Sequence, residues 1–516
     1  MDKAKNSAQS IKNLAQNVKQ TYKDLPYISR AFKASSPMRL AAIATLLGLK
    51  TCDIKKARVL EIGCSFGGNI LYFALNFPAS QIVGIDISPQ QIEGAQNLAK
   101  TLGANNAHFI CADICELASD EIALNELGKF DYIIAHGVYS WVADGVKDAL
   151  LKLTQKCLAP SGLAYISYNV YPGWKEREIL RDLMLFSTSH LSKIDEKISR
   201  SKSVVKSFLN HGKNDILENS NSAFSKEILN HARDICEVYD DFYLAHEHFE
   251  LSNDPKYLSD FVAHARKFGL YYLVDSALSA SFLASGNEAI SANSYNERIK
   301  AEQYADFINM RAFRASILGG ENTAKMCENA LLGRFDATLL NKLYFRAFYK
   351  IQNDTISTPN DEITLHKSIL PLAIIFNENY PKFLSFEELL SKLGLKGEIL
   401  APSLFTLITI GALEISTFAP EFLAFKPRST RLKSSAKKLL EYFCQEKSVI
   451  SAAGVMGELL SLNDKSIAKI ALLFDDKEKN EILNFLKQNG LDDETSELLL
   501  NEISKNLQAA DFFEKI

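Results

Sequence analysis

The sequence lacks most of the features that mark membrane, secreted or metal-binding proteins. It has no run of about 18 apolar residues, so we expect no membrane-spanning helix. Its eight cysteines are scattered without a CxxC pair, which argues against a metal site and is typical of a reducing cytoplasm. Residues 1–20 are polar and have no apolar core of a signal peptide. The net charge of -4 gives no general attraction to nucleic acid.

What the sequence does contain, from Ala57 onward, is a regular alternation of short apolar segments with amphipathic ones. Helices are expected between five strand-like segments: ARVLEIG, QIVGIDIS, AHFICADI, FDYIIAHG and LAYISYNVYP. This alternation predicts an α/β fold with a parallel sheet and helices on both faces. In such a sheet, ligands bind outside the carboxyl ends of the strands, so the residues that follow each strand are the candidate site.

The whole chain, at 516 residues, is long enough for several domains. After the fifth strand the pattern becomes polar and helical, and it then returns to a strand-like LYYLVDSAL. Residues 298–350 also read as helical, and residues 362–430 have the order of elements of a winged helix. We therefore expect four parts: an N-terminal helical cap (1–50), a sheet domain (51–295) with a helical insertion (174–240), a helical and winged-helix-like domain (296–430) and a C-terminal helical region (431–516).

A loop of small residues, VLEIGCSFGGN, follows the first strand. A nucleotide phosphate, a dinucleotide and S-adenosylmethionine are the ligands that usually require so bare a backbone. The phosphate loop is excluded because Asn69 stands where its lysine would be. The dinucleotide motif nearly fits, but Ser65 replaces its second glycine. Glu61 would repel a pyrophosphate, whereas it would attract the ammonium group of a methionine moiety.

Two more acidic residues end the next strands. Asp86 lies about 20 residues after the glycines, where a carboxylate can bind ribose hydroxyls. Asp113 ends the third strand, where it could accept a hydrogen bond from the amine of an adenine. Its alternative role is to cap a helix. Three acids and a glycine loop on one sheet edge favour S-adenosylmethionine.

Several separate blocks of sequence resemble class I S-adenosylmethionine-dependent methyltransferases. More narrowly, they resemble bacterial methyltransferases with a methyltransferase regulatory domain, a group that includes the rickettsial-type protein-lysine methyltransferases. The resemblance runs from about residue 22 to 290 and is carried by YKDLPYISRAF, LEIGCSFGGN, AHGVYSWV, YNVYPGWK and YLAHEHFE. It implies a Rossmann-like sheet, S-adenosyl-L-methionine as cofactor and C-terminal recognition modules. The expected cofactor-binding residues are Glu61, Gly63, Cys64, Ser65, Gly67, Asn69, Asp86, Ile87, Asp113, Ile114, His136 and Gly137.

An aromatic cluster follows the fourth and fifth strands. It either packs the core or forms a pocket beside the sulfonium, since aromatic rings stabilise cations and tyrosine hydroxyls can orient an amine. His136, which comes just before this cluster in the sequence, is expected to line the cofactor site rather than act as a base. We assign catalytic roles to Tyr139, Tyr168, Asn169 and Tyr171, and substrate binding to Tyr27, Trp141, Trp174, His246 and His248.

The last two of these belong to the sequence HEH, which suggests a metal site at first sight. In a strand, His246 and His248 would share one face. No third ligand stands nearby, so no metal is expected and substrate binding is preferred.

The sequence as a whole predicts a cytoplasmic methyltransferase that acts on a protein with an accessible lysine. No nucleic acid partner is expected, and a homodimer is left open. Two alternatives compete with this interpretation: a methyltransferase for a small molecule or RNA, and a non-catalytic regulator that only binds the cofactor.

Overall fold

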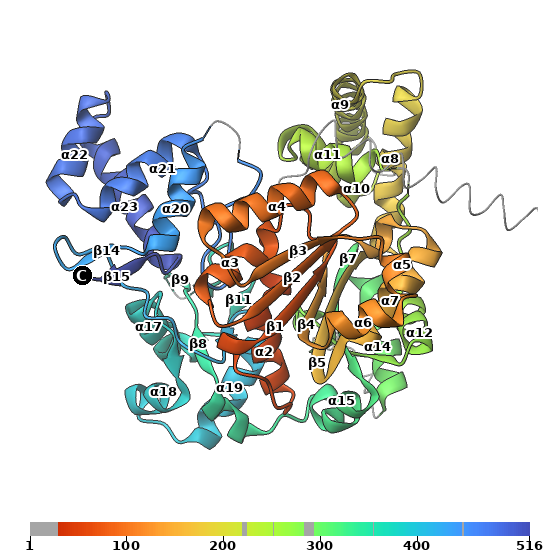
Figure 1. The fold of residues 1–516 in the computed structure, drawn as a ribbon, viewed down its shortest axis with the longest axis horizontal. Coiled ribbons are helices and arrows are strands. Elements are labelled where there is room, and N and C mark those ends of the chain that lie inside the picture. The colour runs from red at the N-terminus through yellow and green to blue at the C-terminus, as the bar shows by residue number, and fades with distance from the viewer. Residues whose placement is uncertain (1–28, 219–223, 251, 283–293, 354, 446–447) are drawn as a thin grey trace, which may run out of the picture.

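The computed structural model describes residues 29–218, 224–250, 252–282, 294–353, 355–445 and 448–516 (Figure 1). Most of the expected N-terminal cap, including Tyr27, lies outside these residues. Its described part forms helix α2 (Pro37–Leu46), with proline as the first helical residue, where its missing N–H costs nothing.

A seven-stranded sheet forms the centre of the molecule, in the order β3-β2-β1-β4-β5-β7-β6 (Figure 1). All five strands expected from the alternating segments are present: β1 (Arg58–Ile62), β2 (Gln81–Asp86), β3 (Ala107–Cys111), β4 (Phe130–Ala135) and β5 (Leu158–Asn169). They pair in parallel, which confirms the predicted α/β class. The loops that follow β1 to β5 therefore meet along one edge of the sheet.

Helices cover both faces of this sheet. On one face, α2, α3 (Gly68–Asn76) and α4 (Pro89–Leu102) contribute their buried residues to one core. On the other face, α7 (Asp144–Cys157) and α12 (Leu258–Lys267) pack in a second core, with the short α5 (Ile114–Leu117) and α6 (Glu121–Leu127) nearby.

The sheet continues past the boundary expected at residue 295. Strand β6 (Leu270–Asp275) pairs with β7 (Phe313–Gly320), and β7 pairs in turn with β5, both antiparallel. The expectation that residues 298–350 are all helical is therefore wrong, because only α14 (Tyr295–Ile308) and short helices precede and follow β7. A domain boundary at residue 295 would leave out β7. Because β7 lies between β5 and β6, β6 would lose its connection to the rest of the sheet.

An insertion of helices stands between β5 and β6, at the ligand-binding edge of the sheet. It contains α8 (Gly173–Thr188), α9 (Ile194–Glu218), α10 (Lys226–Glu237) and α11 (Asp241–His248). The first three lie in the stretch expected to be a helical insertion, and together the four helices enclose a small core of their own.

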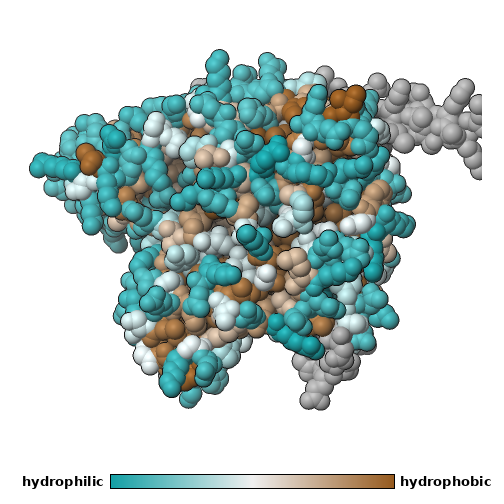
Figure 2. All heavy atoms as spheres, turned by 60° about the horizontal axis from the view of Figure 1, so that its bottom comes forward, coloured by the Kyte–Doolittle hydropathy of each residue, from teal (hydrophilic) through white to brown (hydrophobic). Residues whose placement is uncertain are grey.

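The C-terminal half packs onto the same sheet face as α2 and α3, and its buried residues join that core. Three helices, α17 (Leu370–Asn379), α18 (Phe386–Leu393) and α19 (Gly397–Thr409), accompany a small antiparallel sheet in the order β12-β8-β13, formed by β12 (Leu384–Ser385), β8 (Tyr344–Arg346) and β13 (Glu414–Ser416). A winged helix uses such elements and stays a prediction here. Hydrophobic side chains are exposed on this lobe (Figure 2).

The last part of the chain is helical, as expected, with α20 (Ser434–Phe443), α21 (Lys465–Leu472), α22 (Lys479–Gln488) and α23 (Asp493–Ala509). Its two short strands, β14 (Thr430–Leu432) and β15 (Phe513–Lys515), pair with each other and bring the end of the chain back to the start of this region. In the parts of the chain that the structure describes, no helix is both long and apolar enough to cross a membrane.

Candidate functional site

The glycine loop makes a tight turn between β1 and α3. Gly63 has a φ of +76°, and a Cβ on it would lie 2.5 Å from Val138 Cγ2. The amides of Gly63 and Cys64 both donate to the carbonyl of Ile85, which ties the loop to β2. Gly67, with a φ of +77°, precedes the first residue of α3. The loop therefore has the bare backbone that the sequence predicts.

Glu61, at the end of β1, is buried beneath this loop and is 3% exposed. Asn69 Nδ2 donates to its Oε1 at 2.6 Å, whereas its Oε2 is buried without a hydrogen-bond partner among the described residues. Burial raises the pKa of this carboxyl to about 8. A cationic ligand group would give Oε2 a hydrogen-bond partner. Its positive charge would also stabilise the ionised form of the carboxyl.

Asp86, at the end of β2, holds the loop from the other side. Its Oδ2 accepts from the amide of Ser65 and its Oδ1 from that of Ser88, both at 2.9 Å. The hydroxyl of Ser65 is buried and has no partner in the described structure. Asp113 accepts from the amide of Cys115 at 2.8 Å and so caps α5, which was its alternative role. Half-buried Ile87 and Ile114 follow the two acids.

His136 directly follows β4, at the edge of the sheet where the candidate site lies. Its Nδ1 lies 3.0 Å from the hydroxyl of Tyr165 and 3.3 Å from that of Ser167. Burial lowers the pKa of the imidazole to about 3, so the ring is neutral near pH 7. Gly137, beside it, has a φ of +67° and donates its amide to Ser167 Oγ. These contacts agree with a lining role for His136, because a neutral ring with so low a pKa is a poor proton acceptor.

A segment to which the sequence analysis assigned no cofactor role crosses this site. We call Ser29–Ser36 the strap. The ring of Phe32 stacks on His136 with a centroid distance of 3.6 Å, and its amide donates to Asn69 Oδ1 at 2.8 Å. Ser29 Oγ accepts from the amide of Gly68 at 2.9 Å. A Cβ on Gly68 would lie 2.2 Å from the Ser29 carbonyl oxygen, so this glycine allows the close approach.

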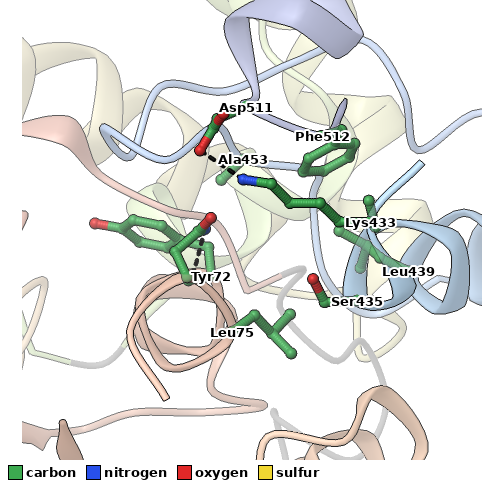
Figure 3. A pocket seen from close by; sticks show the side chains of 10 residues that line it. Tyr72, Leu75, Lys433, Ser435, Leu439, Ala453, Asp511 and Phe512 are labelled. Atoms are coloured by element: carbon green, nitrogen blue, oxygen red, sulfur yellow. Dashed lines mark hydrogen bonds and ion pairs between the residues drawn. The ribbon is translucent and has the colours of Figure 1, made fainter. Parts of the chain in front are cut away.

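The C-terminal region holds the strap in place. The amide of Ser29 donates to Val449 O at 2.9 Å, and the amide of Ser451 donates to Ser29 O at 3.1 Å. Beside this bridge, α3 faces the C-terminal helices across a cavity of about 20 Å³. Figure 3 shows Tyr72 and Leu75 of α3 opposite Lys433, whose ammonium pairs with Asp511 at 2.7 Å. Contacts from the far end of the chain therefore reach the glycine loop.

The side chains of the aromatic cluster differ in burial, and some of them lie fully in the core. Tyr139 and Tyr168 are each 1% exposed and pack against Phe261. The Tyr139 hydroxyl lies 2.7 Å from His264 Nδ1, and that of Tyr168 lies 3.0 Å from Ser316 Oγ. These contacts favour the packing interpretation for both rings.

Tyr171 is half-buried, and its hydroxyl donates to Glu178 Oε1 at 2.6 Å. Asn169 is buried, and its amide group donates to Asn253 Oδ1 at 2.9 Å. The rings of Trp141 and Trp174 meet edge to face at 6.4 Å. Of the candidate catalytic tyrosines, Tyr171 alone has a partly accessible ring.

The two histidines of HEH lie on helix α11 and not on a strand. Positions two apart on a helix point in different directions, so the expectation of a shared face is wrong. His246 Nδ1 lies 3.3 Å from Glu250 Oε1, whereas His248 is fully buried beside His231. Among the described residues, no group of three or more His, Cys, Asp or Glu side chains could hold a metal ion.

The residues at the loop fit the methyl donor S-adenosylmethionine. The unpaired oxygens of Glu61 and Ser65 offer acceptors for its ammonium group. Asp86 and Asp113 stand at the adjoining strand ends, where ribose and adenine would lie.

Comparison with known families agrees with this geometry. Residues 53–233 match a methyltransferase domain, and residues 240–319 match a predicted methyltransferase regulatory domain. The second match ends at 319, one residue before the end of β7, in line with the sheet continuing past 295.

Three rickettsial proteins are similar over long stretches. The uncharacterized protein RP789 of Rickettsia prowazekii is 32% identical over 74% of this chain, which spans 66% of that protein. The uncharacterized protein RP028 of the same organism is 35% identical over 48% of this chain and 94% of its own length. The structure of PKMT2 from Rickettsia typhi in complex with AdoHcy superposes with a TM-score of 0.78 at 25% identity, covering 95% of this chain and all of that one.

Sequence, fold and site therefore agree on a single family. The glycine loop lies between acids at the ends of three parallel strands, and the regulatory domain supplies the last two strands of the same sheet. This chain belongs to the class I S-adenosylmethionine-dependent methyltransferases that carry a methyltransferase regulatory domain.

Proposed function

We propose that this methyltransferase acts on the side-chain amine of lysine in a protein. The observation that carries the proposal is the uncharged, aromatic wall beside the glycine loop, in which His136 lies between Phe32 and Tyr165. The likeness to PKMT2 over 95% of the chain supports it, as does the resemblance of the sequence to protein-lysine methyltransferases.

The reacting lysine must lose a proton before it can accept a methyl group. With a pKa of about 10.4 in water, the amine is almost wholly protonated at neutral pH. A desolvating site lowers that pKa, and a nearby positive charge would lower it further. His136 contributes no charge, because its pKa is about 3, so desolvation by aromatic rings is the available means.

Positioning is the second contribution of the protein. S-adenosylmethionine supplies a methyl group on a positively charged sulfur, which the amine nitrogen takes in line while the sulfonium becomes a thioether. Glu61, Ser65 and Asp86 would fix the donor, and the strap would exclude water from one side. Tyr171 is the candidate for orienting the amine, since it is partly exposed, and its hydroxyl would have to exchange its bond to Glu178 Oε1 for one to the amine. Holding two reactants in line is the main requirement for this kind of transfer.

The test is transfer of labelled methyl groups to a cell lysate, followed by separate protease and nuclease treatment. The proposal predicts label in protease-sensitive material, and acid hydrolysis should yield methylated lysine. Label in nuclease-sensitive or small-molecule fractions would support the rival acceptors instead. Absence of any transfer, with the donor bound, would favour the regulator.

The setting of the reaction belongs to the same proposal. We expect it to occur in the cytoplasm, and the eight cysteines, all of which are free, support a reducing compartment. A homodimer stays an open prediction that sedimentation of the purified protein would test.

A further inference from the structure

A cavity of about 100 Å³ opens between the helical insertion and the segment that leads into β7. Its walls come from the start of α8 at Gly173, from α10 between Glu227 and Asp234, and from Met310 and Ala312. A space of this size holds several water molecules or the end of a long side chain.

The cavity lies beside the methyl-transfer site. Gly173 follows the end of β5 by four residues, and Ala312 directly precedes Phe313, whose ring is 6.1 Å from that of His136. Met310, which lines the cavity, is an exposed apolar side chain. A polypeptide that reaches His136 along this side would pass over the cavity.

A buried polar side chain without a hydrogen-bond partner lines the cavity, and two others lie near it in the fold. His231 lines the cavity and is 6% exposed, yet neither ring nitrogen has a hydrogen-bond partner among the described residues. The same holds for the fully buried His248, 5.5 Å from it, and for the indole nitrogen of Trp174. Buried polar groups are nearly always hydrogen-bonded, so the unpaired nitrogens of His231, which lines the cavity, indicate a polar occupant.

The charged groups that line the cavity determine the charge of the ligand that it suits. Three carboxylates line the cavity, from Glu176, Glu227 and Asp234, against the single guanidinium of Arg177. The Ser225 hydroxyl donates a hydrogen bond to Glu176 Oε2 at 2.8 Å. In the described structure, no ion pair joins Glu227 or Asp234 to a cation. Neutral His231 adds a nitrogen acceptor. The net charge and the free acceptors both suit a cation with several N–H donors.

We propose that this cavity binds a second basic side chain of the acceptor protein, a lysine or arginine near the lysine that is methylated. The inference rests on the proposed protein-lysine activity. The cavity does not suit the reacting lysine itself, because surrounding carboxylates raise the pKa of an ammonium group and keep it protonated. A flanking residue that stays charged is the occupant that such chemistry favours.

The test uses the full chain and synthetic peptides with one central acceptor lysine. A second lysine, a norleucine or a glutamate stands one to four residues before or after it. We expect the second lysine at a particular spacing to raise kcat/KM about tenfold over norleucine, mainly through KM, as for a charged hydrogen bond. Glutamate at that position should lower it.

Substitution in the cavity should remove this preference. The double variant Glu227→Gln with Asp234→Asn is expected to methylate the lysine and norleucine peptides equally, with AdoHcy affinity unchanged. Glu237→Gln is the matched control, since Glu237 is exposed on the same helix and does not line the cavity. A preference that survives the double variant, or that the wild type never shows, would overturn the proposal.

A second readout separates this inference from the proposed function. If the wild type methylates no lysine in any peptide or protein, the proposed function fails. Binding of N-acetyl-lysine methylamide to the AdoHcy-loaded enzyme, followed by NMR, then decides on the cavity alone. Binding by the wild type that the double variant loses supports a cation site, and equal behaviour of the two proteins refutes it.

Discussion

At the scale of single residues, the site depends on a few buried polar groups with incomplete hydrogen bonding. Glu61 has one paired and one unpaired oxygen, and Ser65 has an unpaired hydroxyl. Such atoms are costly to bury, and they are expected where a ligand supplies the missing partner. Tyr139 and Tyr168 are the opposite case, because their hydroxyls already have partners in the core.

The ionisation of Glu61 should couple methyl-donor binding to pH. With a pKa of about 8 in the free protein, this carboxyl is mostly protonated at pH 7. A bound ammonium group favours the carboxylate, so binding should release a proton, and affinity should rise with pH by up to about tenfold per unit between pH 5.5 and 7. Calorimetry of AdoHcy in two buffers of different ionisation enthalpy measures the proton. Glu61→Gln should bind more weakly and without the pH slope, and a flat profile in the wild type would contradict the assignment.

The tyrosines can be separated by removing one hydroxyl at a time. Tyr171→Phe keeps the ring and should lower the methyl-transfer rate about 10²-fold if its hydroxyl orients the amine, since misplacement can cost that much. Tyr168→Phe is the matched control, and should change the rate little because its hydroxyl bonds Ser316 within the core. Single-turnover rates with saturating donor are the measurement. Equal rates for Tyr171→Phe and the wild type would mean that the Tyr171 ring only packs and that its hydroxyl does not orient the amine.

At the scale of elements, the sequence predicts what has a strong local signal. The first five strands have continuous apolar runs and turn residues at both ends, so their class and their places along the chain follow from the pattern, whereas their order within the sheet does not. β7 has no such signal, because FRASILGG contains an arginine that reads as exposed. In the structure Arg314 is fully buried, and its guanidinium pairs with Asp306 at 2.7 Å and with Glu302 at 3.1 Å. These two acids lie on α14, 8 and 12 residues before Arg314, so the sequence of the strand itself does not contain the partners that bury its arginine.

The strap and the donor loop show the same limit of sequence reasoning. The glycines, Glu61 and Asp86 follow a local motif and could be placed in advance. Ser29 and Phe32 contact the loop only because the chain folds back across it, more than 35 residues away in sequence. The expectation of a strand at HEH is also wrong, because two histidines two positions apart do not distinguish a strand from a helix.

The buried Arg314 network should be essential to the position of β7. Arg314→Met removes the guanidinium and leaves the carboxylates of Asp306 and Glu302 buried without it. We expect a loss of about 3–5 kcal/mol in the free energy of unfolding, as for breaking a buried ion pair from one side. Denaturant unfolding followed by circular dichroism measures this.

Arg311→Met is a useful comparison, because Arg311 also pairs with Asp306 but is 25% exposed. This variant should lower the free energy of unfolding much less. Similar losses for the two variants would argue against a special role for Arg314.

The bridge between the strap and the C-terminal region should support donor binding. Ser451→Pro removes the amide that donates to Ser29 O, whereas Ser451→Ala keeps it. We expect the proline variant to bind AdoHcy about tenfold more weakly, as for one lost hydrogen bond and a displaced strap, and the alanine variant to bind normally. Ser29→Ala, which leaves the Gly68 amide without its acceptor, should act in the same direction. Normal affinity in both Ser451→Pro and Ser29→Ala would show that the strap does not matter for the donor.

At the scale of the whole molecule, the C-terminal half packs on the sheet domain and is connected to the glycine loop through the strap. Its residues share a core with α2 and α3, and Val449 and Ser451 reach the strap. A clean division between a catalytic half and a recognition half is therefore too simple. The exposed hydrophobic side chains on the lobe of α17 to α19 (Figure 2) lie on the same half, and include Leu370, Ile374 and Ile399.

The most direct test of the central claim is a methyl-transfer assay with purified full-length enzyme, labelled S-adenosylmethionine and a lysate from which small molecules have been removed. Peptide mass spectrometry should find the label on lysine side chains of one or a few proteins. Asp86→Ala, which loses the carboxylate that contacts the loop at Ser65, should abolish most of the transfer. Label that appears on RNA or on a small metabolite, with no methylated lysine in any protein, would contradict the account.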